Sequence, residues 1–143
     1  MSRPRVLIAD PHPTTRLVAL DALRDAWEVV PLPDDEDPVR ATRRLRPVLL
    51  LLAIPPGRSQ GALRACRSLK TEASPPKVAL LDRAGRLSDP DETMRSWLAD
   101  GVISGGFEAE ALARFVTAVI AGERPVVRGP PTKTGLLGRL LGR

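Results

Sequence analysis

Short runs of apolar residues recur along the chain at roughly regular intervals. Most of them are continuous rather than alternating with polar residues, which is typical of strands buried on both faces of a parallel sheet. Five strands are therefore expected, at 6–9, 27–30, 48–54, 78–81 and 102–103.

The segments between these runs carry apolar residues at helical spacing. Residues 112–120 place them three and four positions apart, so that one stripe faces a core. Asp37 and Asp89 each precede a proline and can cap a helix that begins there. The apolar positions of the other expected helices are Leu17, Leu20 and Leu23 after Pro13, Leu63, Cys66 and Leu69, and Met94, Trp97 and Leu98.

This alternation of strand and helix through five rounds predicts an α/β fold. Successive right-handed crossovers would build a five-stranded parallel sheet with helices on both faces. In such folds, ligands bind beyond the carboxyl ends of the strands. The loops at 10–12, 53–57, 82–83 and 104–106 are therefore the places where a functional site is expected.

Three motifs stand in these loops and the strands before them. They read RVLIADPHP at 5–13, PVLLLLAI at 47–54 and ADGVISGGF at 99–107. Their order and content resemble the receiver domain of bacterial response regulators, of the CheY-like kind. The resemblance implies a flavodoxin-like fold and a receiver-like domain over residues 1–122.

The resemblance also implies where a phosphorylation site would lie. Receivers have two acids after the first strand for Mg²⁺, a phosphate-accepting aspartate after the third, a hydroxyl residue after the fourth and a lysine after the fifth. In this chain the acid pair falls on Asp10 and Pro11, the acceptor on Ala53, the hydroxyl position on Asp82 and the lysine on Gly105.

These departures predict a degenerate pocket. Alanine has no oxygen to attack a phosphoryl donor, so Ala53 excludes the covalent intermediate. Loss of the lysine together with carboxylates avoids an unpaired buried charge, which would cost about 2 kcal/mol or more. No cofactor and no catalytic residue is expected, and hence no enzyme. A weak cation site between Asp10 and Asp82 is left open. The glycines at 105 and 106 predict a freer loop of different geometry.

The length and charge of the chain limit the number of domains and the kinds of partner that are expected. A chain of 143 residues suits one core. The net charge of +5 is concentrated at the end, where residues 123–143 carry five basic residues and one acidic residue. Residues 1–122 are nearly balanced, so a specific nucleic-acid partner is not expected. One cysteine, and no leader or membrane-spanning run, favour a cytoplasmic protein.

The end of the chain differs from the rest. Residues 123–134 are expected to form a proline-containing linker, and residues 135–143 a basic amphipathic tail. In a helix, four leucines would share one side, and Arg139 would lie on another. Three glycines in nine residues make such a helix unstable alone, so it is expected to fold on binding. The residues expected to bind are Leu136, Leu137, Arg139, Leu140 and Leu141.

The sequence does not determine which partner the tail binds. A groove on a protein partner, a neighbouring subunit in a homodimer and an anionic membrane surface, bound weakly, all fit its composition. The favoured function is a stand-alone pseudo-receiver, a phosphorylation-independent adaptor in bacterial signalling, motility or spatial organisation. The alternatives are a regulator phosphorylated at Asp10 or Asp82, and a membrane or nucleic-acid binder acting through the tail.

Overall fold

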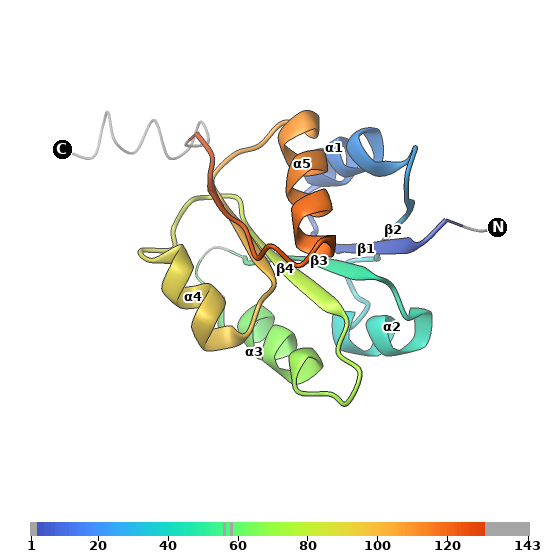
Figure 1. Cartoon of the computed structure of the whole chain (residues 1–143), viewed down its shortest axis with the longest axis horizontal. Helices are drawn as coiled ribbons and strands as arrows, with labels where there is room; N and C mark the ends of the chain where they lie inside the picture. Colours follow the sequence, from blue (N-terminus) through green and yellow to red (C-terminus); the bar gives the residue numbers. More distant parts are fainter. Residues whose placement is uncertain (1–2, 56, 58, 131–143) are drawn as a thin grey trace.

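A computed structural model describes residues 3–55, 57 and 59–130 of the chain. Strands and helices alternate along it (Figure 1). The strands are β1 (Arg5–Ala9), β2 (Glu28–Pro31), β3 (Leu49–Ala53), β4 (Lys77–Asp82), β5 (Gly101–Ser104) and β6 (Val126–Arg128). The helices are α1 (Pro13–Leu23), α2 (Pro38–Leu45), α3 (Ser59–Lys70), α4 (Pro90–Trp97) and α5 (Ala109–Ile120).

The strands form one parallel sheet in the order β2-β1-β3-β4-β5-β6. Helices α1 and α5 cover one face, and α2, α3 and α4 cover the other (Figure 1). The leucines of β3 alternate between the two cores and are almost fully buried. This arrangement confirms the α/β fold and the two-sided burial expected from the continuous apolar runs.

The sheet has one strand more than the five expected. Strand β6 lies inside the segment 123–134 that was expected to be only a linker, and it pairs with β5. Val126 packs on one core and Val127 on the other, so this short strand is apolar on both sides. Two valines followed by an arginine are too short a pattern to indicate a strand, which is why the sequence missed it.

The caps of two helices are as the sequence predicts. The Asp37 carboxylate accepts a hydrogen bond from the Val39 backbone N–H at 3.1 Å, and Asp89 accepts one from Glu92 at 3.1 Å. Helix α1 begins differently, because the Nδ1 atom of His12 accepts from the Thr14 N–H at 3.3 Å. His12 is thus a helix cap on the surface.

Two of the expected apolar positions are wrong. Leu17 in α1 is 68% exposed, whereas Thr15, Ala19 and Leu23, which are spaced by four, form the buried face. Leu98 is not helical, because it takes a left-handed backbone conformation that ends α4. Among the described residues, no helix has both the length and the apolar character needed to cross a membrane.

Candidate functional site at the carboxyl edge of the sheet

The predicted site residues meet at one edge of the sheet. In the strand register, Ala9 lies opposite Leu52, so Asp10 and Ala53 follow side by side. Asp82 ends β4 opposite Ser104, and Gly105 comes directly after β5. The structure therefore brings Asp10, Ala53, Asp82 and Gly105 to the carboxyl edge, and Pro11 lies there on the surface.

Asp10 is buried but only half satisfied. Its side chain accepts one hydrogen bond, from the His12 backbone N–H to Oδ1 at 2.9 Å. The other oxygen, Oδ2, is buried and has no partner among the described residues. A buried carboxylate oxygen without a partner carries a desolvation cost, so this atom is a candidate to receive a donor or a cation.

In Asp82, by contrast, both carboxylate oxygens accept hydrogen bonds from neighbouring residues. Its Oδ1 accepts from the Arg86 backbone N–H at 3.1 Å, and its Oδ2 accepts from the Leu87 N–H at 2.9 Å and the Ser104 hydroxyl at 2.8 Å. Its backbone carbonyl also accepts from Gly85 at 3.0 Å and Gly105 at 2.7 Å. The side chain thus fixes the β4–α4 loop and ties it to β5.

Ser104 is a member of this cluster for which the sequence analysis predicted no role, although it lies in the expected loop at 104–106. It is buried, and its hydroxyl is the donor that satisfies Asp82 from the neighbouring strand. The only signal for it was the strand register, which a single sequence does not give. Asp82 and Ser104 together form a polar contact between β4 and β5, and internal donors fill three of the roughly four acceptor sites of the carboxylate.

The two glycines after β5 make room for the end of the chain. A Cβ atom on Gly105 would lie 2.6 Å from the carbonyl oxygen of Gly129, and one on Gly129 would overlap that of Gly106. The backbones are joined by hydrogen bonds from Gly106 to Pro130 at 2.7 Å and from Gly129 to Ser104 at 2.8 Å.

The expectation of a freer loop at 105–106 is therefore wrong. Gly105 does use the freedom of glycine, with a φ of 106°. That freedom serves a close approach between two backbones, which holds the loop in place. Any side chain at position 105, a lysine included, requires the segment after β6 to move away.

A second contact ties the loop after β4 to α1. Arg83 donates from Nη1 to the hydroxyl of Thr15 at 2.9 Å, and the same atom lies 3.3 Å from Nδ1 of His12. A pocket of about 480 Å³ lies beside this contact, and Asp10 and Ala53 are part of its lining. Arg83 places a positive charge near the end of β3, where the sequence analysis did not expect one.

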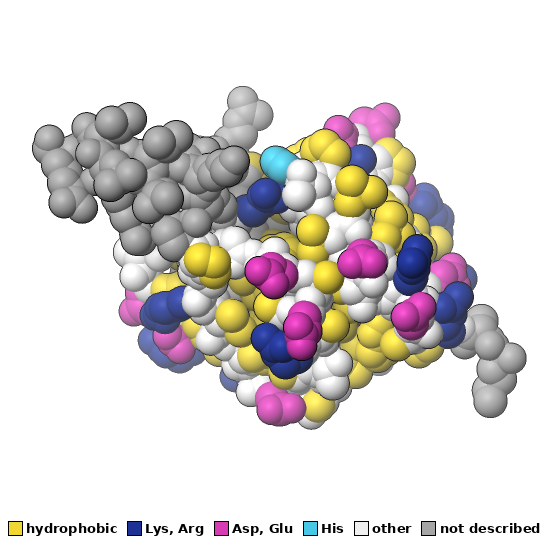
Figure 2. Space-filling model, turned by 90° about the horizontal axis from the view of Figure 1, so that it is seen from above, with side chains coloured by type: hydrophobic (Ala, Val, Ile, Leu, Met, Phe, Trp, Pro, Cys, Tyr) yellow, Lys and Arg dark blue, Asp and Glu magenta, His cyan; other side chains and the backbone are white. Residues whose placement is uncertain are grey.

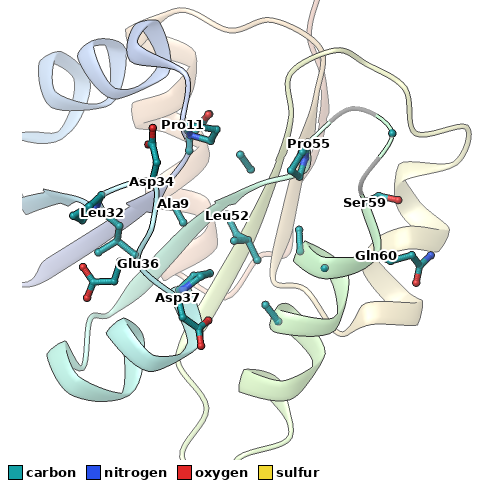
Figure 3. Close-up of a pocket in the computed structure, with 18 residues that line it drawn as sticks. Ala9, Pro11, Leu32, Asp34, Glu36, Asp37, Leu52, Pro55, Ser59 and Gln60 are labelled. Carbon is teal, nitrogen blue, oxygen red and sulfur yellow. The ribbon is translucent and has the colours of Figure 1, made fainter.

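A larger hollow opens on the other side of Asp10. It has a volume of about 680 Å³ and lies between the loop that leads into α2 and the beginning of α3 (Figure 3). Figure 3 shows Ala9, Leu32 and Leu52 on the apolar side, with carboxylates on the α2 loop. We name this hollow the acidic pocket. Its acidic lining residues are Asp10, Asp34, Glu36 and Asp37.

The single cysteine of the chain, Cys66, lies outside this site. Cys66 is fully buried in α3, next to an ion pair between Lys70 Nζ and Asp100 Oδ2 at 2.7 Å. Burial, with a smaller contribution from Asp100, raises the pKa of the Cys66 thiol to about 12. The prediction that Cys66 is a small buried apolar residue is confirmed, and the thiol stays protonated at neutral pH.

On the face covered by α1 and α5, basic and acidic side chains are interspersed (Figure 2). The predicted tail residues, Leu136, Leu137, Arg139, Leu140 and Leu141, lie outside the described residues. Within the described part of the chain, no group of three or more His, Cys, Asp and Glu side chains is arranged to hold a metal ion.

The fold is shared with solved structures of receiver domains. A response regulator from Thermotoga maritima matches with a TM-score of 0.69 and 23% identity, over 83% of this chain and 98% of the other. The Vibrio cholerae chemotaxis protein CheY4 matches with a TM-score of 0.68 and 16% identity, over 82% and 99%.

A third structure is more similar in sequence. The signal receiver domain of a signal transduction histidine kinase from Syntrophus aciditrophicus has 25% identity and a TM-score of 0.65, over 83% of this chain and 91% of the other. No protein-family model and no curated protein matches the sequence. At this level of identity the comparisons establish architecture: the chain has the flavodoxin-like fold of response-regulator receiver domains.

Proposed function

We propose that the chain is a phosphorylation-independent signalling adaptor, a receiver-type fold that acts by binding protein partners. The observation that carries this proposal is the methyl side chain of Ala53 at the end of β3, beside Asp10. A receiver's acceptor would stand at that point, and alanine cannot form the acyl phosphate. A cytoplasmic bacterial setting goes with this proposal.

The crowded end of β5 supports the same conclusion. The space that a lysine at position 105 would need is taken by the backbone of Gly129. A phosphoryl group at this edge would therefore lack a cation at the end of β5, where receivers carry their lysine, and the nearby Arg83 is hydrogen-bonded to Thr15. The acceptor and the cation are missing from two different strands, which fits a fold that is used for binding.

Of the two alternative phosphate acceptors, Asp10 and Asp82, the hydrogen bonds favour Asp10. Asp82 gives both carboxylate oxygens to internal hydrogen bonds, so phosphorylation there would first break the contact with Ser104. Asp10 keeps one oxygen without a partner among the described residues. A phosphorylatable regulator, if the chain were one, would have to use Asp10.

Capture of partners under two conditions tests the adaptor role. The full chain is immobilised and exposed to lysate of the source cells, with and without acetyl phosphate and Mg²⁺. We expect the same partner in both conditions, and its loss with Leu140→Asp in the tail. The matched control is Leu17→Asp, which places the same charge on an exposed leucine of α1 and is expected to retain the partner.

Two outcomes would count against the proposal. Capture that appears only with acetyl phosphate would indicate a phosphorylated regulator. A chain that captures no protein, but sediments with anionic lipid vesicles or DNA in a salt-dependent way, would favour the surface binder instead.

A further inference from the structure

The acidic pocket combines an apolar floor with a negative rim. Ala9, Leu32 and Leu52 provide part of the floor, and the described lining includes no lysine or arginine. Asp34 is paired with Arg16, and Glu36 with Arg44. The other two acidic lining residues, Asp10 and Asp37, take part in none of the ion pairs between described residues.

This composition selects the chemistry of an occupant. An apolar floor favours leucine-sized side chains, and carboxylates without a cationic partner favour arginine or lysine at the rim. Asp10 adds a carboxylate to this lining, and because its buried Oδ2 has no partner among the described residues, its negative charge can attract such a cation. A short segment with both leucines and basic residues is therefore the complementary ligand.

The chain itself contains such a segment. Residues 131–143 hold four leucines and three basic residues, and no acidic residue. The pocket and this segment are thus opposite in charge and similar in their apolar content.

The path from β6 to the pocket is short. Pro130 is held at the carboxyl edge by its bond with Gly106. From β6 to β3 the sheet order counts three strand spacings, which is about 14 Å. Six extended residues reach about 20 Å and ten reach about 33 Å. Leu136 is therefore within reach of the β3 side of the acidic pocket of its own molecule, and Leu140 is within reach of the far side, beside β1.

We propose that the segment 136–141 binds in the acidic pocket of the same chain. The leucines lie against the floor, and Arg139 faces the carboxylates of Asp10 and Asp37. A segment joined by so short a stretch of chain meets its site at an effective concentration of about a millimolar, so a weak affinity is sufficient. A protein partner of the tail would then compete with the pocket, which makes the contact autoinhibitory.

This inference goes beyond the proposed function, because it concerns the isolated chain. The test uses the full chain labelled with ¹⁵N, with Gly142→Cys carrying a nitroxide spin label. Cys66 is buried and its thiol has a pKa of about 12, so the label attaches to the new cysteine. We expect the label to broaden the amide signals of Leu32, Gly61 and Ala62, and to leave those of Thr117 on α5 sharp.

Two variants test where the contact lies. Ala62→Lys places a cation in the wall of the acidic pocket and is expected to restore the broadened signals. Ala113→Lys makes the same change at a partly buried alanine of α5, on the other face of the sheet, and is expected to leave the broadening unchanged.

Other results would overturn the proposal. Sharp signals throughout, or broadening centred on α1 and α5, would mean that the segment does not occupy the pocket. A control mixes two chains, one that carries the nitroxide but no ¹⁵N and one that carries ¹⁵N but no nitroxide. The ¹⁵N signals of this mixture show no broadening if the contact is within one molecule. Broadening in that mixture would assign the occupant to a second copy. None of these results depends on whether the chain captures a partner or is phosphorylated.

Discussion

The two halves of the carboxyl edge of the sheet differ in how completely their polar groups are hydrogen-bonded within the fold. On the side of β4, β5 and β6, the Asp82 side chain accepts three hydrogen bonds, and two glycines pack against the backbone at 129–130. On the side of β1 and β3, Asp10 keeps an oxygen without a partner among the described residues, and Ala53 leaves space beside it. One half is therefore built into the fold, and the other is open to a ligand.

The difference has a physical origin in the sixth strand. Strand β6 brings the chain back over the end of β5, where a side chain at position 105 would otherwise project. Polar groups on that side are satisfied internally, whereas those beside β1 and β3 border two pockets. Function at this edge is thus expected on the β1–β3 side alone.

The largest expected effect is on stability when the closed side loses its central carboxylate. Asp82→Ala leaves two backbone N–H groups and the buried Ser104 hydroxyl without their acceptor, which costs about 3 kcal/mol in the free energy of unfolding. Asp10→Ala removes one hydrogen bond and one unpartnered oxygen, and is expected to cost about 1 kcal/mol or less. Urea denaturation measures both. Equal losses would contradict the difference between the two sides.

The next effect tests the close approach of the backbones. Gly129→Ala places a Cβ atom against the carbonyl of Gly106 and is expected to lower the free energy of unfolding by about 2 kcal/mol, because β6 must shift. The control is Gly61→Ala in α3, where a Cβ atom meets nothing within 4 Å. That change is expected to raise stability by about 0.5 to 1 kcal/mol. A neutral Gly129→Ala, with unchanged amide exchange in β5, would mean that β6 does not close this side.

A smaller effect, in alkaline solution, reports on α3, the helix that forms a wall of the acidic pocket. The thiol of Cys66 titrates near pH 9 when unfolded, and its pKa in the folded chain is about 12. Its contribution to stability is complete below pH 9, and it falls by about 1 kcal/mol between pH 9 and pH 10, the range in which the two proteins are compared. Thermal unfolding should show a shallower decline for Cys66→Ala. Parallel curves would indicate that α3 opens and exposes the thiol.

The strands and cores could be predicted because burial on two faces leaves a direct trace in the sequence. The four leucines of β3 form an unbroken apolar run, and Asp37 and Asp89 each precede a proline. The position of this strand and the beginnings of two helices therefore follow from the local sequence pattern. The carboxyl edge followed from topology, which groups the ends of parallel strands.

What could not be predicted depends on contacts between distant residues. Leu17 looks like a core residue, yet α1 packs through Thr15, Ala19 and Leu23. The partner of Asp82 is known only once the β4–β5 register places Ser104 opposite it. Gly105 and Gly106 suggested freedom, because nothing in the sequence shows that Gly129 approaches them.

The central claim is that this receiver fold carries no phosphate acceptor, and incubation of the full chain with acetyl phosphate and Mg²⁺ tests it most directly. Intact-protein mass spectrometry follows the reaction, with a phosphorylatable receiver treated in parallel. We expect the mass of this chain to stay unchanged while that of the other receiver increases by a phosphoryl group. A Mg²⁺-dependent phosphoryl adduct that Asp10→Asn abolishes would contradict the account.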